Sequence, residues 1–248
     1  MCGICGCTEN DLTHSLHEIT ETHHHHPELI QVEQNLLAKN NQFAAANRDY
    51  FLKRNMTALN LMSSPGSGKT TLLARTISEL KKELNMAIIV GDQQTNLDAE
   101  RLKAAGANAI QINTGQVCHL DAHTVGHAVE TLTLPLPTIL FIENIGNLVC
   151  PALFDLGETY KVVLLSVTEG DNKPLKYPEM FHHADLMILT KIDLLPYVEF
   201  NPEKCIEYAR RINPLIKVIS LSATTGLGFD EWIQWVSSDC NKTMKPEL

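Results

Sequence analysis

The segment 63–71 contains the residues of this chain that are best suited to bind phosphate. It has the sequence Ser-Ser-Pro-Gly-Ser-Gly-Lys-Thr-Thr and directly follows the apolar run 58–62. In such a loop the glycines let backbone N–H groups close around phosphates, the lysine reaches the outer phosphates and the hydroxyl holds Mg²⁺. Ser63 replaces the first glycine of the usual G-x-x-x-x-G-K-[ST] pattern, so only the first turn of the loop is atypical. The predicted nucleoside triphosphate ligands are Ser64, Gly66, Ser67, Gly68, Lys69, Thr70 and Thr71.

Two later segments are suited to recognise a guanine base. The segment 190–193, Thr-Lys-Ile-Asp, follows an apolar run, so the stem of Lys191 can cover a base and the carboxylate of Asp193 can accept two hydrogen bonds. Guanine offers those two donors, whereas adenine presents a lone pair in place of one, and this mismatch would reject ATP. The threonine stands where asparagine is commoner, a change that removes an amide able to brace the loop. The predicted guanine-binding residues are Thr190, Lys191, Asp193, Ser222 and Ala223.

Two acidic residues that each follow a strand-like run are candidates for the Mg²⁺ site. We assign Asp92 and Glu143 to the metal and water shell beside Thr70, with Asp92 orienting the attacking water and Glu143 binding Mg²⁺ directly or through water. The N–H of Gly146 could sense the γ-phosphate. Structural alternatives stay open, because Asp92 could cap a helix and Glu143 could be a paired acid at the end of a strand. The predicted catalytic residues are Lys69, which stabilises charge, and Asp92.

The N-terminus carries a second kind of chemistry. Cys2, Cys5 and Cys7 place three thiols within six residues, and the intervening glycines allow a tight wrap around one ion. Thiolates suit soft or borderline metals, and an amine of Cys2 freed by removal of Met1 would favour square-planar Ni²⁺ or Cu²⁺. Histidines that could be further ligands or merely polar surface are His23 to His26, His123 and His127.

A third cluster is predicted farther along the chain. Cys118 and His119 follow a glycine turn, and Cys150 lies four residues beyond Gly146. Thiol, imidazole and thiol provide three ligands that suit Zn²⁺ as readily as Ni²⁺. Movement of the segment after Glu143 with nucleotide state would move one of these ligands, which offers a route from GTP hydrolysis to metal release. The alternative is a pair of buried thiols beside a hydrogen-bonded histidine.

The pattern of the whole chain must position these residues. Residues 1–27 have few large apolar side chains and predict a flexible arm, 28–55 has helical spacing, and 56–248 alternates strand and helix patterns. This rhythm predicts an α/β fold with a doubly wound, mostly parallel sheet of about seven strands. The predicted strands are 58–62, 87–90, 109–112, 139–142, 162–167, 186–189 and 218–221, and the clearest helices are 71–84, 98–105, 121–132 and 202–212.

Composition limits the partners and the compartment. The 248 residues are 44% hydrophobic and carry a net charge of −9 without a basic run, which argues against a nucleic-acid partner. No apolar run approaches the roughly 18 residues of a membrane span, so we expect no membrane insertion and a cytoplasmic location. Seven cysteines, odd in number and unevenly spaced, favour metal binding or burial over a disulfide framework.

Taken together, these residues resemble the HypB family of GTPases that help to load nickel into [NiFe]-hydrogenase. The resemblance covers nearly everything from Leu29 onward, and some members also carry a C-x-x-C-G-C nickel site at the N-terminus. It is carried by the segments 64–70, 91–101, 114–121, 143–151 and 190–193. The resemblance implies GTP-promoted homodimerisation, a metal site at the dimer interface formed by Cys118, His119 and Cys150, and the partners HypA and the [NiFe]-hydrogenase large subunit precursor. It also implies a class of dimerising GTPases that includes the urease accessory GTPase.

Alternatives of other classes remain at this stage. The chain could bind or store nickel or zinc around a structural nucleotide, or deliver nickel to another enzyme such as urease. A small-molecule kinase would need an arginine-rich lid, and the window 168–177 offers only lysines. Arg75 and Arg101 are expected to point away from the phosphates on their helices, so we predict slow GTP turnover that dimerisation or a partner stimulates.

Overall fold

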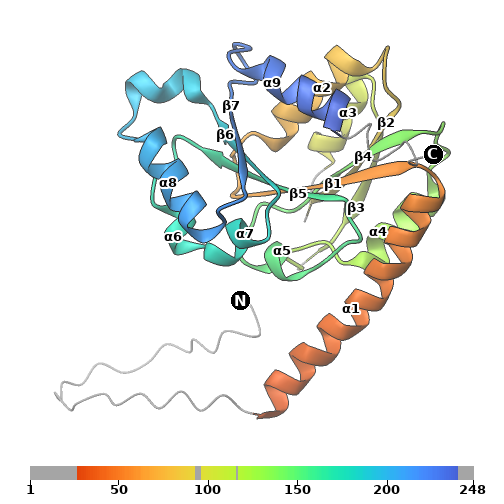
Figure 1. Cartoon of the computed structure of the whole chain (residues 1–248). Coiled ribbons are helices and arrows are strands. Elements are labelled where there is room, and N and C mark those ends of the chain that lie inside the picture. Colours follow the sequence, from red (N-terminus) through yellow and green to blue (C-terminus); the bar gives the residue numbers. More distant parts are fainter. Residues whose placement is uncertain (1–26, 93–95, 116, 240–248) are drawn as a thin grey trace, which may run out of the picture.

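The computed structural model describes residues 27–92, 96–115 and 117–239, which form one parallel sheet covered by helices on both faces (Figure 1). The sheet has the strand order β3-β2-β4-β1-β5-β6-β7, and every neighbouring pair is parallel. The strands are β1 Met56–Ser63, β2 Met86–Asp92, β3 Asn108–Asn113, β4 Thr138–Glu143, β5 Tyr160–Ser166, β6 Leu186–Thr190 and β7 Lys217–Ser220. The seven predicted strands are therefore confirmed, and the sheet is parallel throughout.

The helices divide between the two faces of the sheet. The α-helices are α1 Pro27–Lys53, α2 Lys69–Leu80, α3 Leu97–Ala105, α4 Ala122–Thr131, α5 Cys150–Leu153, α6 Lys173–Lys176, α7 Pro178–His182, α8 Pro202–Ile212 and α9 Phe229–Gln234. A 3₁₀-helix, η1 Ile192–Tyr197, and a π-helical turn, η2 Trp235–Asp239, complete the set. Helices α2, α3 and α9 pack on one face, whereas α1, α4, α7 and α8 pack on the other (Figure 1). Because the inner strands are covered on both sides, β2, β4, β5 and β6 consist mainly of apolar residues, as parallel strands usually do.

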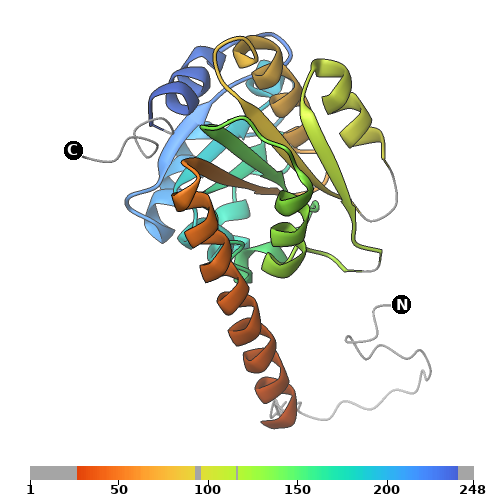
Figure 2. The same cartoon turned by 90° about the vertical axis from the view of Figure 1, so that its right-hand side faces the viewer.

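Helix α1 packs on the body through its C-terminal half, and polar side chains make much of that contact. Figures 1 and 2 both show its first turns extending beyond the sheet. The amide of Asn40 donates to the carbonyl of Asp155 (2.7 Å), and that of Asn47 donates to the carbonyls of Ala122 (2.7 Å) and Leu156 (3.0 Å). The predicted apolar face is only partly used, since Leu36 is 58% exposed.

Some element boundaries and short helices differ from the sequence prediction. Helix α2 ends at Leu80 rather than at residue 84, because the N–H groups of Glu83 and Leu84 both turn back to the carbonyl of Leu80. Helices α5, α6 and α7 were not predicted, since they have only four or five residues and show no helical period. Among the described residues, no helix is long and apolar enough to cross a membrane.

Candidate nucleotide and metal sites

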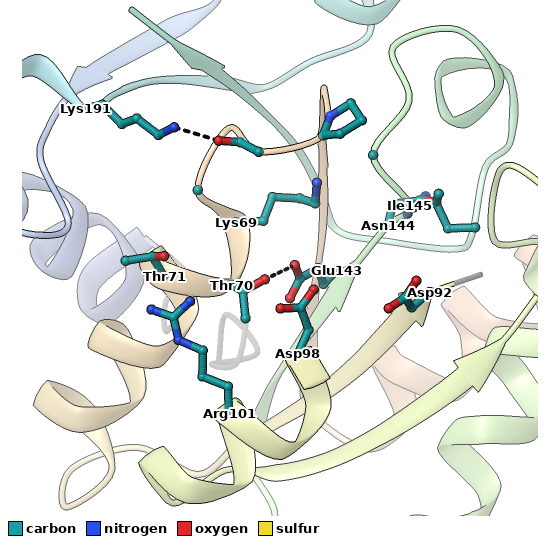
Figure 3. A pocket seen from close by; sticks show the side chains of 15 residues that line it. Lys69, Thr70, Thr71, Asp92, Asp98, Arg101, Glu143, Asn144, Ile145 and Lys191 are labelled. Atoms are coloured by element: carbon teal, nitrogen blue, oxygen red, sulfur yellow. Dashed lines mark hydrogen bonds between the residues drawn. The ribbon is translucent and has the colours of Figure 1, made fainter. Parts of the chain in front are cut away.

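The predicted phosphate loop forms one wall of a cavity of about 500 Å³ at the carboxyl end of the sheet (Figure 3). Gly66 and Gly68 have φ angles of 73° and 103°, values that L side chains rarely adopt, and α2 begins directly afterwards at Lys69. The first N–H groups of α2 have no acidic residue in their turn to neutralise them, so this end of the helix is suited to an anion. The cavity is lined by Pro65, Gly66, Gly68, Lys69, Thr70, Thr71, Gly91, Asp92, Asp98, Arg101, Glu143, Asn144, Ile145, Gly146 and Lys191.

Ser63, the residue that departs from the usual pattern, organises the loop. Its hydroxyl donates to the carbonyl of Ser64 (2.7 Å) and accepts from the hydroxyl of Ser67 (2.5 Å) and the ammonium of Lys69 (2.7 Å). One fully buried hydroxyl therefore donates once and accepts twice. The serine provides side-chain bonds that a glycine at this position could not make.

The buried charges of the cavity fit a Mg²⁺–triphosphate ligand. Burial lowers the pKa of Lys69, an effect that the carboxylates of Glu143, Asp98 and Glu169 oppose. Burial raises the pKa of Glu143 to about 7, although the hydroxyl of Thr70 donates to its carboxylate at 2.7 Å. Within the described residues, Oε2 of Glu143 is buried without a hydrogen-bond partner. This oxygen beside a threonine hydroxyl is a suitable donor set for Mg²⁺.

Residues of the predicted guanine segments brace the phosphate loop. The hydroxyl of Thr190 donates to the carbonyl of Ser67 at 2.7 Å, so the threonine braces the loop although it lacks the amide of the commoner asparagine. The ammonium of Lys191 donates to the carbonyl of Gly66 at 2.7 Å. The second segment, 219–225, lies beside the first, because the N–H of Ile192 donates to the carbonyl of Leu221. Asp193, Ser222 and Ala223 lie in these two adjoining segments and do not line the phosphate cavity.

The other predicted catalytic residues also reach the cavity. Asp92 ends β2 and lines it, while the N-cap of α3 is Asn96, so Asp92 does not cap that helix. Gly146 lies against the phosphate loop so closely that a Cβ there would be 2.8 Å from the Cα of Pro65. Only glycine permits this approach of the segment after β4.

Two residues that we did not predict, Asp98 and Arg101, line the cavity from α3. The expectation that Arg101 points away is wrong, since α3 packs beside α2 and turns this face of the helix toward the phosphate loop. The available sequence signal was that the two residues are three apart, and so on one face of the helix that follows the end of β2. Arg75 does point away, because its guanidinium donates to Glu79 (2.8 Å) and to the carbonyl of Ala223 (3.0 Å).

The predicted cluster of Cys118, His119 and Cys150 is brought together. One ligand atom from each residue lies within 4.8 Å of the others, and the two Sγ atoms are 3.0 Å apart. Burial lowers the pKa of His119, whose ring stacks on Phe154 with centroids 3.8 Å apart. Burial, followed by the neighbouring Cys118 thiol, raises the pKa of Cys150 to about 11. All three residues are half-buried and can be reached by a metal ion.

The remaining candidate ligands divide into three groups. Cys2, Cys5, Cys7 and His23 to His26 lie outside the described residues, as does Cys240. Cys205 is fully buried among apolar side chains, as expected for a packing thiol. His123 and His127 lie on the exposed face of α4 with their Nε2 atoms 3.1 Å apart, so they do not join the cysteine cluster of the described chain.

A buried amide connects the two sites. Asn144 follows Glu143 directly and is 1% exposed. Its Oδ1 accepts from the N–H of Leu120 (3.2 Å) and the N–H of Ile145 (2.9 Å), and its Nδ2 donates to Oδ1 of Asn60 (3.2 Å). Leu120 is the residue after His119, so one side chain ties the metal loop to the segment that leaves the nucleotide cavity.

Comparison with known proteins agrees with this arrangement. Residues 57–220 match the family described as "CobW/HypB/UreG, nucleotide-binding domain". The chain belongs to the CobW/HypB/UreG family. Within that family, it is 58% identical to hydrogenase maturation factor HypB of Azotobacter chroococcum mcd 1 over 208 residues, which are 84% of this chain and 68% of the relative. The resemblance to the HypB family inferred from the sequence is thereby confirmed.

Solved structures of the CobW/HypB/UreG family share the fold. The crystal structure of HypB from Helicobacter pylori in complex with nickel matches with a TM-score of 0.79 and 36% identity, covering 85% of this chain and 99% of that one. Hydrogenase maturation factor HypB from Archaeoglobus fulgidus matches with a TM-score of 0.77 and 41% identity, covering 82% of this chain and 100% of that one.

Proposed function

We propose that this protein is a GTP-hydrolysing nickel metallochaperone that assists the maturation of [NiFe]-hydrogenase. The observation that carries the proposal is the short segment shared by the two sites: Glu143 lines the nucleotide cavity and Cys150 lies seven residues later in the metal cluster. Asn144 adds a second connection through Leu120. A change in the cavity can therefore reach both loops that supply metal ligands.

The cavity residues suit hydrolysis of a guanine nucleotide. Lys69, the N–H groups of the loop and the N-terminus of α2 stabilise the charge of the phosphates, and Asp92 orients the attacking water. Thr70 and Glu143 would hold Mg²⁺, with Asp92 in its shell, and the ion would supply positive charge at the outer phosphates. Asp193 and the N–H of Ala223 select guanine over adenine. Turnover is slow until a second copy or a partner stimulates it.

The cysteine cluster binds the metal ion that the protein delivers. Cys118, His119 and Cys150 bind Ni²⁺ or Zn²⁺ and remain accessible at half-burial. As the resemblance to the HypB family implies, a second copy of the chain in a GTP-promoted dimer completes the coordination. Cys2, Cys5 and Cys7 form a separate nickel site in the N-terminal arm. The partners are HypA and, directly or through it, the precursor of the [NiFe]-hydrogenase large subunit, in the cytoplasm.

Turnover of GTP and ATP with and without added Ni²⁺ tests the proposal, alongside size-exclusion chromatography with a non-hydrolysable GTP analogue. The proposal expects hydrolysis of GTP but not ATP, a rate that nickel changes, and a dimer that requires the GTP analogue. Metal binding without turnover of either nucleotide would instead support a metal-binding protein with a structural nucleotide. ATP turnover with transfer to a small molecule would support a kinase.

A further inference from the structure

Arg101 is a cation in the nucleotide cavity that the proposed chemistry does not use. Its side chain is exposed on α3 and lines the cavity. The guanidinium makes no hydrogen bond or ion pair within the described part of the chain, although Asp98 lies three residues earlier on the same helix. Such neighbours commonly pair. Here Figure 3 shows the carboxylate of Asp98 turned toward Glu143 and the guanidinium turned the other way, toward Thr71.

The direction of Arg101 fixes which part of a nucleotide it faces. Lys191 belongs to the guanine segment and marks the base end of the cavity, whereas Lys69 and Asp92 belong to the outer phosphates. In Figure 3 the guanidinium lies on the Thr71 side, and Asp92 lies on the far side of Glu143. Thr71 follows the Mg²⁺-binding Thr70 in the first turn of α2, where the inner phosphate of a nucleotide approaches the helix N-terminus.

The charges lining the cavity leave Arg101 available for this task. The ammonium of Lys69 is hydrogen-bonded to Ser63 and that of Lys191 to the carbonyl of Gly66, so both are already directed at the loop. The cavity is also lined by the carboxylates of Asp92, Asp98 and Glu143. A planar guanidinium matches the geometry of a phosphate and binds it through two parallel hydrogen bonds.

We propose that Arg101 binds the inner phosphate of GTP and GDP, and so sets nucleotide affinity rather than the rate of hydrolysis. This inference rests on the proposed function, because it requires a guanine nucleotide in the cavity. The inner phosphate does not change its bonding when the outer one leaves. A contact that is equally strong in the ground state and the transition state lowers KM without raising kcat.

Calorimetric titration of the full chain with GMP, GDP and a non-hydrolysable GTP analogue tests the inference, with Arg101→Gln as the variant. Lys103→Gln is the matched control, since Lys103 is an exposed cation on the same helix and does not line the cavity. The Arg101 variant should bind all three nucleotides about 10- to 100-fold more weakly, by a similar factor for each. The loss should shrink at high salt, kcat should stay within about threefold of wild type, and the control should match wild type.

Several results would overturn the inference while leaving the proposed function intact, and the first three concern affinity and rate. They are unchanged affinity in the Arg101 variant, a loss confined to the GTP analogue, and a fall in kcat at constant KM. The last two would place the guanidinium at the outer phosphate. A loss that salt does not alter would point to an uncharged part of the nucleotide and would equally overturn it. A wild-type chain that binds ATP and GTP alike would instead contradict the proposed guanine specificity, which is a separate failure.

Discussion

The nucleotide cavity and the cysteine cluster differ in how firmly this chain holds their residues. Ser63, Lys69 and Glu143 are at most 8% exposed, and the cavity is held by two short bonds: Lys69 donates to Ser63 and Thr70 donates to Glu143, each at 2.7 Å. Cys118, by contrast, lies in the loop before α4 and Cys150 begins the four-residue helix α5; both are half-buried, and they contact each other through weakly bonding thiols. The cavity is preorganised within one chain, whereas the cysteine cluster takes its geometry from the relative positions of two separate segments. Nucleotide-driven movement is therefore expected at the metal end.

The largest effect should come from Lys69→Ala, which separates the nucleotide cavity from the nickel site of the N-terminal arm. Loss of the buried ammonium removes charge stabilisation at the outer phosphates, and GTP turnover should fall by at least about 100- to 1000-fold. Nickel affinity at Cys2, Cys5 and Cys7 should stay unchanged in an equilibrium competition with a chelator. If metal binding collapsed together with turnover, the separation of the sites would be wrong.

Cys118→Ser should have the opposite effect, because it should impair metal binding and leave GTP turnover nearly unchanged. In a chain whose arm cysteines are replaced by serine, this change should weaken metal binding by at least about 100-fold, because it removes a thiolate ligand outright. Basal GTP turnover should remain within about threefold. Cys205→Ala is the control, since it removes a thiol that is buried in the core. Equal metal affinity in the Cys118→Ser and Cys205→Ala variants would show that the cysteine cluster is not the metal site.

The raised pKa of Glu143 gives the cavity a pH dependence of its own. The folded protein holds this proton up to about pH 7, whereas the unfolded chain releases it near 4.5. The folded state thus binds more protons in that window, and without Mg²⁺ the free energy of unfolding should fall as pH rises from about 4.5 to 7. The expected loss is on the order of 3 kcal/mol relative to Glu143→Gln, measured by denaturant titration. Parallel pH profiles of the two proteins would contradict this.

Asn144→Ala is expected to have a smaller effect on stability than the Glu143 titration. It should also weaken the effect of nucleotide on nickel affinity. The change leaves the N–H of Leu120 and the side-chain oxygen of Asn60 without the partner that Asn144 provides, which should cost about 1 to 3 kcal/mol of unfolding free energy. Asn47→Ala is the matched control, because it removes a buried asparagine that bonds Ala122 and Leu156 instead. Both variants should lose stability, and only Asn144→Ala should weaken the effect of nucleotide on nickel affinity. If nucleotide changed nickel affinity equally in the Asn144→Ala and Asn47→Ala variants, Asn144 would not connect the two sites.

Much of the fold could be predicted because a parallel sheet covered on both faces leaves near-continuous apolar runs in the sequence. The run 139–142, for example, lies within β4, every residue of which is buried. The short helices α5 to α7 could not be predicted, since four or five residues give no period. The polar packing of α1 through Asn40 and Asn47 was also missed, because their value depends on carbonyl groups 75 or more residues away.

The sites divide in the same way. Residues within one contiguous pattern, such as Lys69 or Thr70, could be predicted to lie near the phosphates, because a loop between a strand and a helix fixes their position locally. The direction of Arg101 depends on how α3 packs against α2, and the sequence alone suggested the wrong direction. The bonds of Asn144 depend on Asn60 and Leu120, which are 84 and 24 residues away in sequence.

The central claim is that the nucleotide cavity and the cysteine cluster are energetically coupled. The most direct test measures nickel affinity at Cys118, His119 and Cys150, in a chain whose arm cysteines are serine, with GDP and with a non-hydrolysable GTP analogue. We predict affinities that differ by about 5- to 150-fold, and a matching change in the relative affinities for the two nucleotides when nickel is added, since coupling is reciprocal. Identical nickel affinities in the two nucleotide states would contradict the account.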